Sequence, residues 1–308
     1  MSALSSFFTN RTVIIATMHH KEQVIAPVVE SAMGVKTQVP RDFDTDCLGT
    51  FTRDVQRPAD QLATARLKAE AALELTGESI AIASEGSFGP HPQIPFAACD
   101  RELVFLLDTQ HQLEIVGEVL STQTNFQGQT IHSVQAALDF AQTVGFPEHG
   151  LVVMGSEMAK ARLPKRTPKR MPERTTRRTP DSSAIAKGIT TEASLIEAVT
   201  SALEQSPNQQ AHIETDMRAL YNPTRMQIIA EATVDLVQKV SQRCPNCGYP
   251  GFTITQRYPG LPCSLCQAAT LLTLSVVYEC QHCHFRETRQ FPEGNQFADP
   301  TYCSFCNP

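Results

Sequence analysis

The sequence predicts an α/β fold: an open, mostly parallel sheet flanked by helices, with a small zinc-ribbon module at the C-terminus. Short apolar, β-branched runs at residues 12–17 and 79–84 are separated by segments with the apolar spacing of helices. Eight of the ten cysteines lie in four Cys-x-x-Cys pairs near the C-terminus, a spacing typical of metal sites rather than disulfides.

The bulk composition is that of a globular protein. With 308 residues and 41% hydrophobic content, the chain has room for one large or two ordinary domains plus a small appendage. No apolar run approaches the length of about 18 residues that a membrane span needs, and the N-terminus lacks the pattern of a secretory signal. We therefore expect a cytoplasmic protein, in a compartment that keeps thiols reduced.

The first 120 residues alternate between strand and helix patterns. Glycines at positions 34 and 77 follow helical segments and predict where those helices end. The predicted elements are a strand at 12–17, a helix ending before Gly34, a strand at 36–39, a helix at 59–76, a strand at 79–84 and an antiparallel hairpin at 102–108 and 113–120. The hairpin is expected at the edge of the sheet, whose other strands are expected to be parallel with right-handed crossovers.

The later part of the first domain continues this pattern around a basic segment. Helices are predicted at 133–143, 191–204 and 226–240, with short strands at 151–155 and 212–215, and order is expected to resume near 184–188. Asn222 is expected to cap the last helix, with Pro223 in its first turn. We predict one α/β domain at 1–240, interrupted by a disordered insertion at about 157–183.

Residues 157–180 of this insertion hold nine Lys/Arg against two Glu, whereas the chain as a whole carries a net charge of −6. Nucleic-acid binding is therefore not expected, except through the insertion.

The four cysteine pairs predict two Cys₄ sites in a double zinc-ribbon module at 241–308. The expected metal ligands are Cys244, Cys247, Cys263, Cys266, Cys280, Cys283, Cys303 and Cys306. Two such pairs complete a tetrahedron, so eight thiolates match two structural Zn²⁺ ions. An iron centre and a single metal with spare thiols remain the alternatives.

Loop-closure entropy favours neighbouring cysteine pairs in each site, although crossed or nested arrangements stay open. Thiolates alone leave no open metal position for water, which indicates a structural role or a recognition surface. Three basic against four acidic residues from position 244 to the end favour a protein partner or domain bracing over nucleic acid.

Polar residues gather where strands and loops of the first domain end. The candidate catalytic residues are Asp46, Glu85, His91 and Asp216. The candidate substrate-binding residues are His19, Lys21, Arg53, Ser87, Arg218 and Arg225. Carboxylates with Lys and Arg at one sheet edge suit a phosphorylated ligand, with Mg²⁺ or Mn²⁺ as an expected catalytic companion.

Several of these residues also have a purely structural interpretation. Asp46 could cap its turn, His91 could hydrogen-bond its own loop, and Asp216 could form an ion-pair network with Arg218 and Arg225. Glu85 carries the functional hypothesis best, because a carboxylate that ends an apolar strand must be solvated or paired.

The expected function is thus metal-dependent hydrolysis of a nucleotide or other small phosphorylated molecule by a zinc-binding protein. The alternative is a non-catalytic binding module that recruits protein or nucleic acid through the zinc ribbons and the basic insertion. No membrane association is expected.

Several motifs carry a resemblance to known families. The motifs are Ala-Thr-Met-His-His-Lys-Glu at 16–22, Asp-Thr-Asp-Cys-Leu-Gly-Thr-Phe at 44–51, Ser-Glu-Gly-Ser-Phe-Gly-Pro-His-Pro at 84–92, Glu-Thr-Asp-Met-Arg-Ala at 214–219 and Asn-Pro-Thr-Arg-Met at 222–226. With the cysteine pairs, they resemble a bacterial family of uncharacterised proteins that joins an α/β N-terminal domain to a zinc-ribbon tail.

The start of the chain is also similar to inosine/xanthosine triphosphate pyrophosphatases, which begin with a strand, Ala-Thr-x-Asn-x-x-Lys and a helix. Ala16 and Thr17 agree with that pattern, whereas His19 replaces its asparagine and Lys21 comes one residue early. The resemblance implies phosphate binding by Lys21, and that family's pattern contains no cysteine tail.

Overall fold

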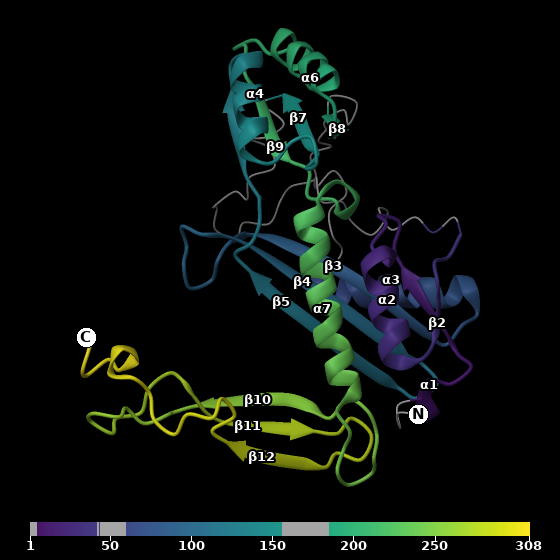
Figure 1. The fold of residues 1–308 in the computed structure, drawn as a ribbon, viewed down its shortest axis with the longest axis vertical. Coiled ribbons are helices and arrows are strands. Elements are labelled where there is room, and N and C mark those ends of the chain that lie inside the picture. The colour runs from purple at the N-terminus through teal and green to yellow at the C-terminus, as the bar shows by residue number, and fades with distance from the viewer. Residues whose placement is uncertain (1–4, 42, 44–59, 156–184) are drawn as a thin grey trace, which may run out of the picture.

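The computed structural model describes residues 5–41, 43, 60–155 and 185–308, and these residues form three sheets (Figure 1). The largest sheet has the order β2-β1-β3-β4-β5. Its strands are β1 (Thr12–Ala16), β2 (Lys36–Gln38), β3 (Ile80–Pro90), β4 (Ala98–Asp108) and β5 (Leu113–Ser121). The predicted insertion at 157–183 lies outside the described residues.

The prediction of a mostly parallel sheet is wrong, because the largest sheet is mixed. Strand β1 pairs in parallel with β2 and β3, but β3 pairs antiparallel with β4, and β4 pairs antiparallel with β5. Only residues 91–97 join β3 to β4, which is too short for the dozen or so residues of a parallel crossover. The β4–β5 hairpin is confirmed, although β4 begins earlier than predicted.

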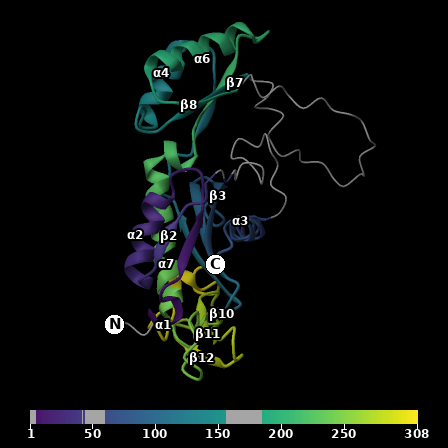
Figure 2. The ribbon, with the colours of Figure 1, turned by 90° about the vertical axis from the view of Figure 1, so that its right-hand side faces the viewer.

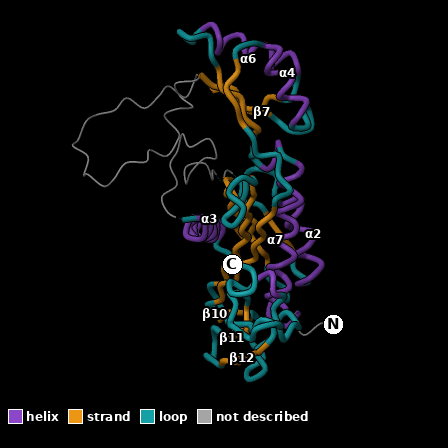
Figure 3. The backbone as a smooth tube through the Cα atoms, turned by 90° about the vertical axis from the view of Figure 1, so that its left-hand side faces the viewer, coloured by secondary structure: helices purple, strands orange, loops and turns teal. Residues whose placement is uncertain are grey.

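Helices cover both faces of this sheet (Figures 2 and 3). Helices α2 (Glu22–Met33) and α7 (Pro223–Ser241) pack on one face against a core that includes Ile80, Ile82, Val104 and Leu106. Helix α3 (Gln61–Thr76) packs on the other face against residues that include Ala81, Ala83, Leu103 and Phe105. The alternation of side chains along β3 and β4 therefore decides which polar residue faces which helix.

The local sequence explains where these helices begin and end. Asp60 accepts a hydrogen bond from the Ala63 amide at the start of α3, and Asn222 accepts one from the Arg225 amide at the start of α7. Helices α2 and α3 end at Gly34 and Gly77, which have positive φ angles of 68° and 71°. The predicted cap of α7 is thus confirmed.

A second sheet, shown at the top of Figure 1, has its own hydrophobic core. Its order is β6-β9-β7-β8, and each neighbouring pair is antiparallel. Its elements are β6 (Gly128–Ile131), α4 (Val134–Thr143), β7 (Leu151–Gly155), β8 (Ile185–Ile189), α6 (Glu192–Glu204) and β9 (Ala211–Thr215). The single open sheet that the sequence predicts is therefore divided into two in the structure.

The cysteine pairs flank a third sheet of three antiparallel strands, β10 (Thr253–Pro259), β11 (Thr273–Glu279) and β12 (Arg286–Gln290). Three short helical turns complete the described elements: α1 (Ser5–Phe8), η3 (Ala219–Tyr221) and η4 (Pro300–Tyr302). None of the helices in the described ranges is long and apolar enough to cross a membrane.

Candidate functional site

The eight paired cysteines form two groups, one at each end of the third sheet. The proximal cysteine centre consists of Cys244, Cys247, Cys280 and Cys283; the distal cysteine centre consists of Cys263, Cys266, Cys303 and Cys306. The first pair of the sequence thus joins the third, and the second joins the fourth. The expectation that neighbouring pairs share a site is wrong.

The antiparallel strands explain this crossed pairing. The residues before β10 and the β11–β12 turn lie at one end of the ribbon, whereas the β10–β11 turn and the residues after β12 lie at the other. Loop-closure entropy grows only with the logarithm of loop length, so strand pairing outweighs it.

The spacing of the sulfur atoms suits a tetrahedral metal. Neighbouring Sγ atoms lie 3.6 Å apart in the proximal centre, and 3.6 and 3.8 Å apart in the distal centre. A tetrahedron with zinc–sulfur bonds of about 2.3 Å has edges of about 3.8 Å. The protein therefore carries two four-thiolate groups that can each hold a metal ion, and the donor set is that of a structural zinc site.

The proximal centre is built into the core of the first domain. Cys244 and Cys280 are buried in the same hydrophobic cluster as α2 and α7. Tyr249 stacks on His282 at 4.5 Å between ring centroids and donates a hydrogen bond to the carbonyl of His111, beside β5. The metal at this centre would brace the ribbon against the domain.

The distal centre carries apolar side chains that face solvent. Leu265, Leu271, Tyr302 and Phe305 are all exposed, and Leu271 and Phe305 retain 93% and 77% of their accessible surface. This end of the ribbon therefore presents an apolar surface rather than a charged one.

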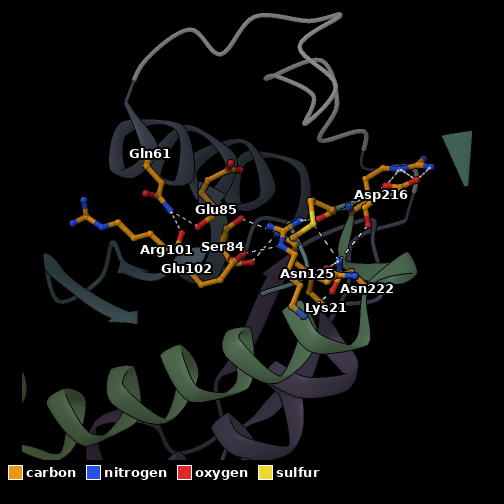
Figure 4. Close-up of polar contacts among 12 residues, drawn as sticks. Lys21, Gln61, Ser84, Glu85, Arg101, Glu102, Asn125, Asp216 and Asn222 are labelled. Carbon is orange, nitrogen blue, oxygen red and sulfur yellow. Dashed lines mark hydrogen bonds and ion pairs between the residues drawn. The ribbon is translucent and has the colours of Figure 1, made fainter. Parts of the chain in front are cut away.

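A buried polar cluster lies on the α7 face of the largest sheet, just beyond the end of β1 (Figure 4). We call Lys21, Ser84, Asp100, Glu102 and Arg225 the polar cluster. Strand β1 stops at Ala16, opposite Ala83, while β3 continues. The Lys21 ammonium takes the place beside β3 that β1 leaves open, and donates to the carbonyl oxygen and the Oγ of Ser84, each at 3.0 Å.

Arg225, in the first turn of α7, anchors the other side of the cluster. Its Nε donates to Oε1 of Glu102 at 2.6 Å, and its Nη1 donates to the Met217 carbonyl. The opposite residue Gly86 has no side chain, which makes room for this pair: a Cβ there would lie 2.2 Å from Glu102 Oε1 and 2.4 Å from an Arg225 Nη.

Asp100 and Glu102 share one face of β4, and both are fully buried. Both carboxylate oxygens of Asp100 and Oε2 of Glu102 lack a hydrogen-bond donor among the described residues. A proton held between Asp100 and Glu102 would supply one of the missing hydrogen bonds. Burial first, and then the Glu102 charge, raises the pKa of Asp100 to about 8.

The pKa of the Lys21 ammonium is shifted in the opposite direction, downward. Burial first, and then the nearby Arg225 charge, lowers the pKa of Lys21 to about 7, against the partial opposition of Glu85 and Glu102. Near neutral pH, the cluster therefore contains a lysine that can lose its proton and an aspartic acid that keeps its own.

Glu85 lies on the other face of the sheet, because it follows Ser84 directly in β3. Its carboxylate forms a buried ion pair with Lys68 of α3. Its backbone carbonyl accepts a hydrogen bond of 2.6 Å from the side-chain Nε2 of Gln61. Glu85 and Lys21 thus approach β3 from opposite sides.

Asp216 adjoins the polar cluster through the chain leading into α7. Its carboxylate binds Arg218 Nε at 3.0 Å, Arg218 Nη2 at 2.7 Å and the Gly188 amide at 3.0 Å. Asn222 donates to Asn125 at 2.9 Å nearby. Asp216 and Arg218 therefore form an ion pair that holds the end of β9, whereas Arg225, which the structural interpretation also includes, pairs with Glu102 instead.

Three of the remaining predicted residues, His91, Ser87 and His19, lie among the described residues. His91 accepts hydrogen bonds of 3.2 Å from the Gln93 and Ile94 amides and so holds the β3–β4 loop. Ser87 is exposed on β3, and His19 is half-buried in the loop after β1. Asp46 and Arg53 lie outside the described residues.

Sequence reasoning missed Lys68, Asp100 and Glu102, although each left a signal. Asp100 and Glu102 are two residues apart at the start of an apolar run, a spacing that puts both on one face of a strand. Lys68 shares the helical stripe of Ala65, Ala69 and Ala72, which are all buried.

One family model matches this chain in two segments, residues 68–174 and 172–308, which together span well over half of it. Its description is a domain of unknown function (DUF6671). The chain belongs to the DUF6671 family. A search of the curated proteins gives no match. These comparisons give no support to a similarity with the inosine/xanthosine triphosphate pyrophosphatases.

The DUF6671 match includes both cysteine centres and most of the polar cluster. Ser84, Asp100, Glu102 and Arg225 lie within it, whereas Lys21 precedes it. Both cysteine centres and four of the five residues of the polar cluster therefore lie in the part of the chain that matches the family model.

Proposed function

We propose that this DUF6671 protein is a zinc-binding hydrolase that acts on a nucleotide or other small phosphorylated molecule, with the polar cluster as its acid–base site. The observation that carries the proposal is the burial of Lys21 and Asp100 in one cluster with Glu102 and Arg225: burial lowers the pKa of Lys21 to about 7 and raises that of Asp100 to about 8. Strongly perturbed titratable groups held together by specific partners are typical of catalytic sites.

In proton transfer, Lys21 would act as the base and Asp100 as the acid. At neutral pH a substantial fraction of Lys21 is uncharged and can accept a proton, while Asp100 remains protonated and can donate one. Acid–base groups are most effective when their pKa values lie near the working pH. Arg225 and Glu102 would hold this pair in place.

The charge balance favours an anionic substrate. On the α7 face, Lys21 and Arg225 carry up to two positive charges, against the one carboxylate of Glu102 while Asp100 is protonated. A phosphate group beside Arg225 would offset this surplus positive charge.

A requirement for Mg²⁺ or Mn²⁺ stays a prediction. Outside the two cysteine centres, the described residues contain no group of three or more His, Asp or Glu ligands that converge on one point. The predicted Asp46 lies outside those residues.

The test is a turnover assay of the full-length protein on panels of nucleotides and sugar phosphates, with Mg²⁺, Mn²⁺ or EDTA. We expect Lys21→Met and Asp100→Asn each to lower kcat/KM by roughly 100-fold or more. The matched controls Lys36→Met and Asp139→Asn change exposed residues and should leave it unchanged. Absence of turnover on every panel, or equal turnover by Lys21→Met and the wild type, would overturn the proposal.

The apolar surface at the distal cysteine centre favours a second candidate function, in which the zinc ribbon recruits a protein partner. The ribbon's near balance of charge argues against nucleic acid there. Any nucleic-acid binding would rest on the insertion at 157–183, and deleting that segment should then abolish salt-sensitive retention on nucleic acid. Retention that survives the deletion would reject the insertion as the contact.

A further inference from the structure

A pocket opens between the β3–β4 loop and the second sheet, next to the polar cluster but distinct from it. Its volume is about 410 Å³, and residues of both sheets line it. The lining residues used below are Pro90, Pro95, Phe96, Phe126, His212 and Glu214.

The walls of the pocket suit a flat, apolar surface. Two prolines and two phenylalanines contribute to it, and Phe96 retains 94% of its accessible surface at the tip of the loop. Hydrogen bonds from the His91 amide to the Ala97 carbonyl at 2.8 Å and from the Ala97 amide to the Ile94 carbonyl at 2.9 Å hold this loop in shape.

One side of the pocket is polar. His212 and Glu214 are two residues apart on β9, so their side chains share one face, and His212 Nε2 lies 3.5 Å from a Glu214 carboxylate oxygen. Gly128 opens the space before them, since a Cβ there would lie 3.0 Å from His212 Nε2. An imidazole and a carboxylate together can accept and donate hydrogen bonds at the edge of a ring.

A chain of aromatic contacts connects the pocket to the polar cluster. The Phe126 ring in the pocket wall lies 5.7 Å from the Phe88 ring, and the Arg225 guanidinium lies 5.1 Å from the Phe88 centroid. The Phe88 ring thus lies between the pocket wall and the guanidinium that binds Glu102.

We propose that this pocket binds a planar heteroaromatic ring of the nucleobase type, with Phe96 and Phe126 against its faces and His212 with Glu214 at its polar edge. The assignment of that ring to the substrate rests on the proposed function, which requires that a phosphate attached to it reach Arg225 and Lys21. Ring binding itself requires no turnover.

Saturation-transfer NMR with adenosine and guanosine as probes, and ribose 5-phosphate as the ring-free comparison, tests this pocket. We expect transfer to the base protons, little transfer to ribose 5-phosphate, and a loss of affinity of at least roughly fivefold in Phe126→Ala and Phe96→Ala, as for one base–aromatic stack. Phe305→Ala removes an exposed ring at the distal centre and should bind like the wild type.

Glu214→Gln keeps the shape of the pocket and should change the preference between adenosine and guanosine. Absence of transfer to either nucleoside, or equal affinity in Phe126→Ala and the wild type, would overturn this assignment. Because nucleosides carry no phosphate to hydrolyse, binding without turnover separates failure of the proposed hydrolase from failure of the pocket.

Discussion

Gly86 lies directly against Glu102 across the β3–β4 pair, so that a single added methyl group would meet the Glu102 carboxylate at 2.2 Å. The same Cβ would meet an Arg225 nitrogen at 2.4 Å. Because Gly86 has no side chain, the Arg225 guanidinium of α7 can lie against the sheet, with Asp100 and Glu102 buried beneath it.

Gly86→Ala should therefore break the ion pair between Arg225 and Glu102. We expect the free energy of unfolding to fall by about 2–4 kcal/mol, from overpacking together with a disrupted buried pair. Urea denaturation measures it. Gly89→Ala, three residues along the same strand, is the control, because its Cβ would meet nothing within 4 Å. Equal stability of the two variants would refute the role given to Gly86.

Asp100 should make stability depend on pH. Its pKa is about 8 in the folded protein and 3.8 ordinarily, so between these values the folded state binds one more proton than the unfolded chain. The contribution of this group to stability therefore falls as the pH rises from about 4 to about 8. Urea midpoints across this range should fall less steeply in Asp100→Asn than in the wild type. Parallel pH profiles would contradict the shift.

The ion pair between Lys68 and Glu85 should show strong coupling. Lys68→Met leaves the buried Glu85 carboxylate without this partner and should cost about 3 kcal/mol of stability. The double variant Lys68→Met/Glu85→Gln removes both charges and should be clearly more stable than Lys68→Met alone. A double-mutant cycle in urea measures the coupling, and additive effects would show that the pair is not a unit.

The two cysteine centres should differ in what they support. Cys280→Ser disturbs a centre within the core of the first domain and should lower the main unfolding temperature by several degrees. Cys303→Ser disturbs the distal centre and should leave that transition in place. Elemental analysis should find one metal ion fewer per chain in each variant. An unchanged transition in Cys280→Ser would contradict the bracing role.

The sequence predicts metal ligands well because a Cys-x-x-Cys turn itself brings two sulfurs to one point. Which turns meet depends on the pairing of β10, β11 and β12, and local spacing carries no information about that. The crossed arrangement of the centres was therefore missed.

The polar cluster was predictable only in part. Lys21 and Arg225 stand out beside strand and helix boundaries, but Asp100 resembles a loop residue until β4 is known to begin at Ala98. Glu85 was grouped with Lys21 because a strand pattern shows alternation without showing which face meets which helix. The short β3–β4 connection makes the sheet mixed and fixes where β4 begins. The pairing of β3 with β4 then fixes which face of the sheet each side chain takes.

Burial and the Arg225 charge should keep the Lys21 side chain ready to lose its proton near neutral pH. A pH titration of lysine side-chain carbons by NMR, with the Lys21 signal assigned through Lys21→Met, measures this directly in the folded protein. We expect one lysine signal that titrates at about pH 7 and is absent from the variant. A Lys21 signal that titrates near its ordinary value of 10.5 would contradict it.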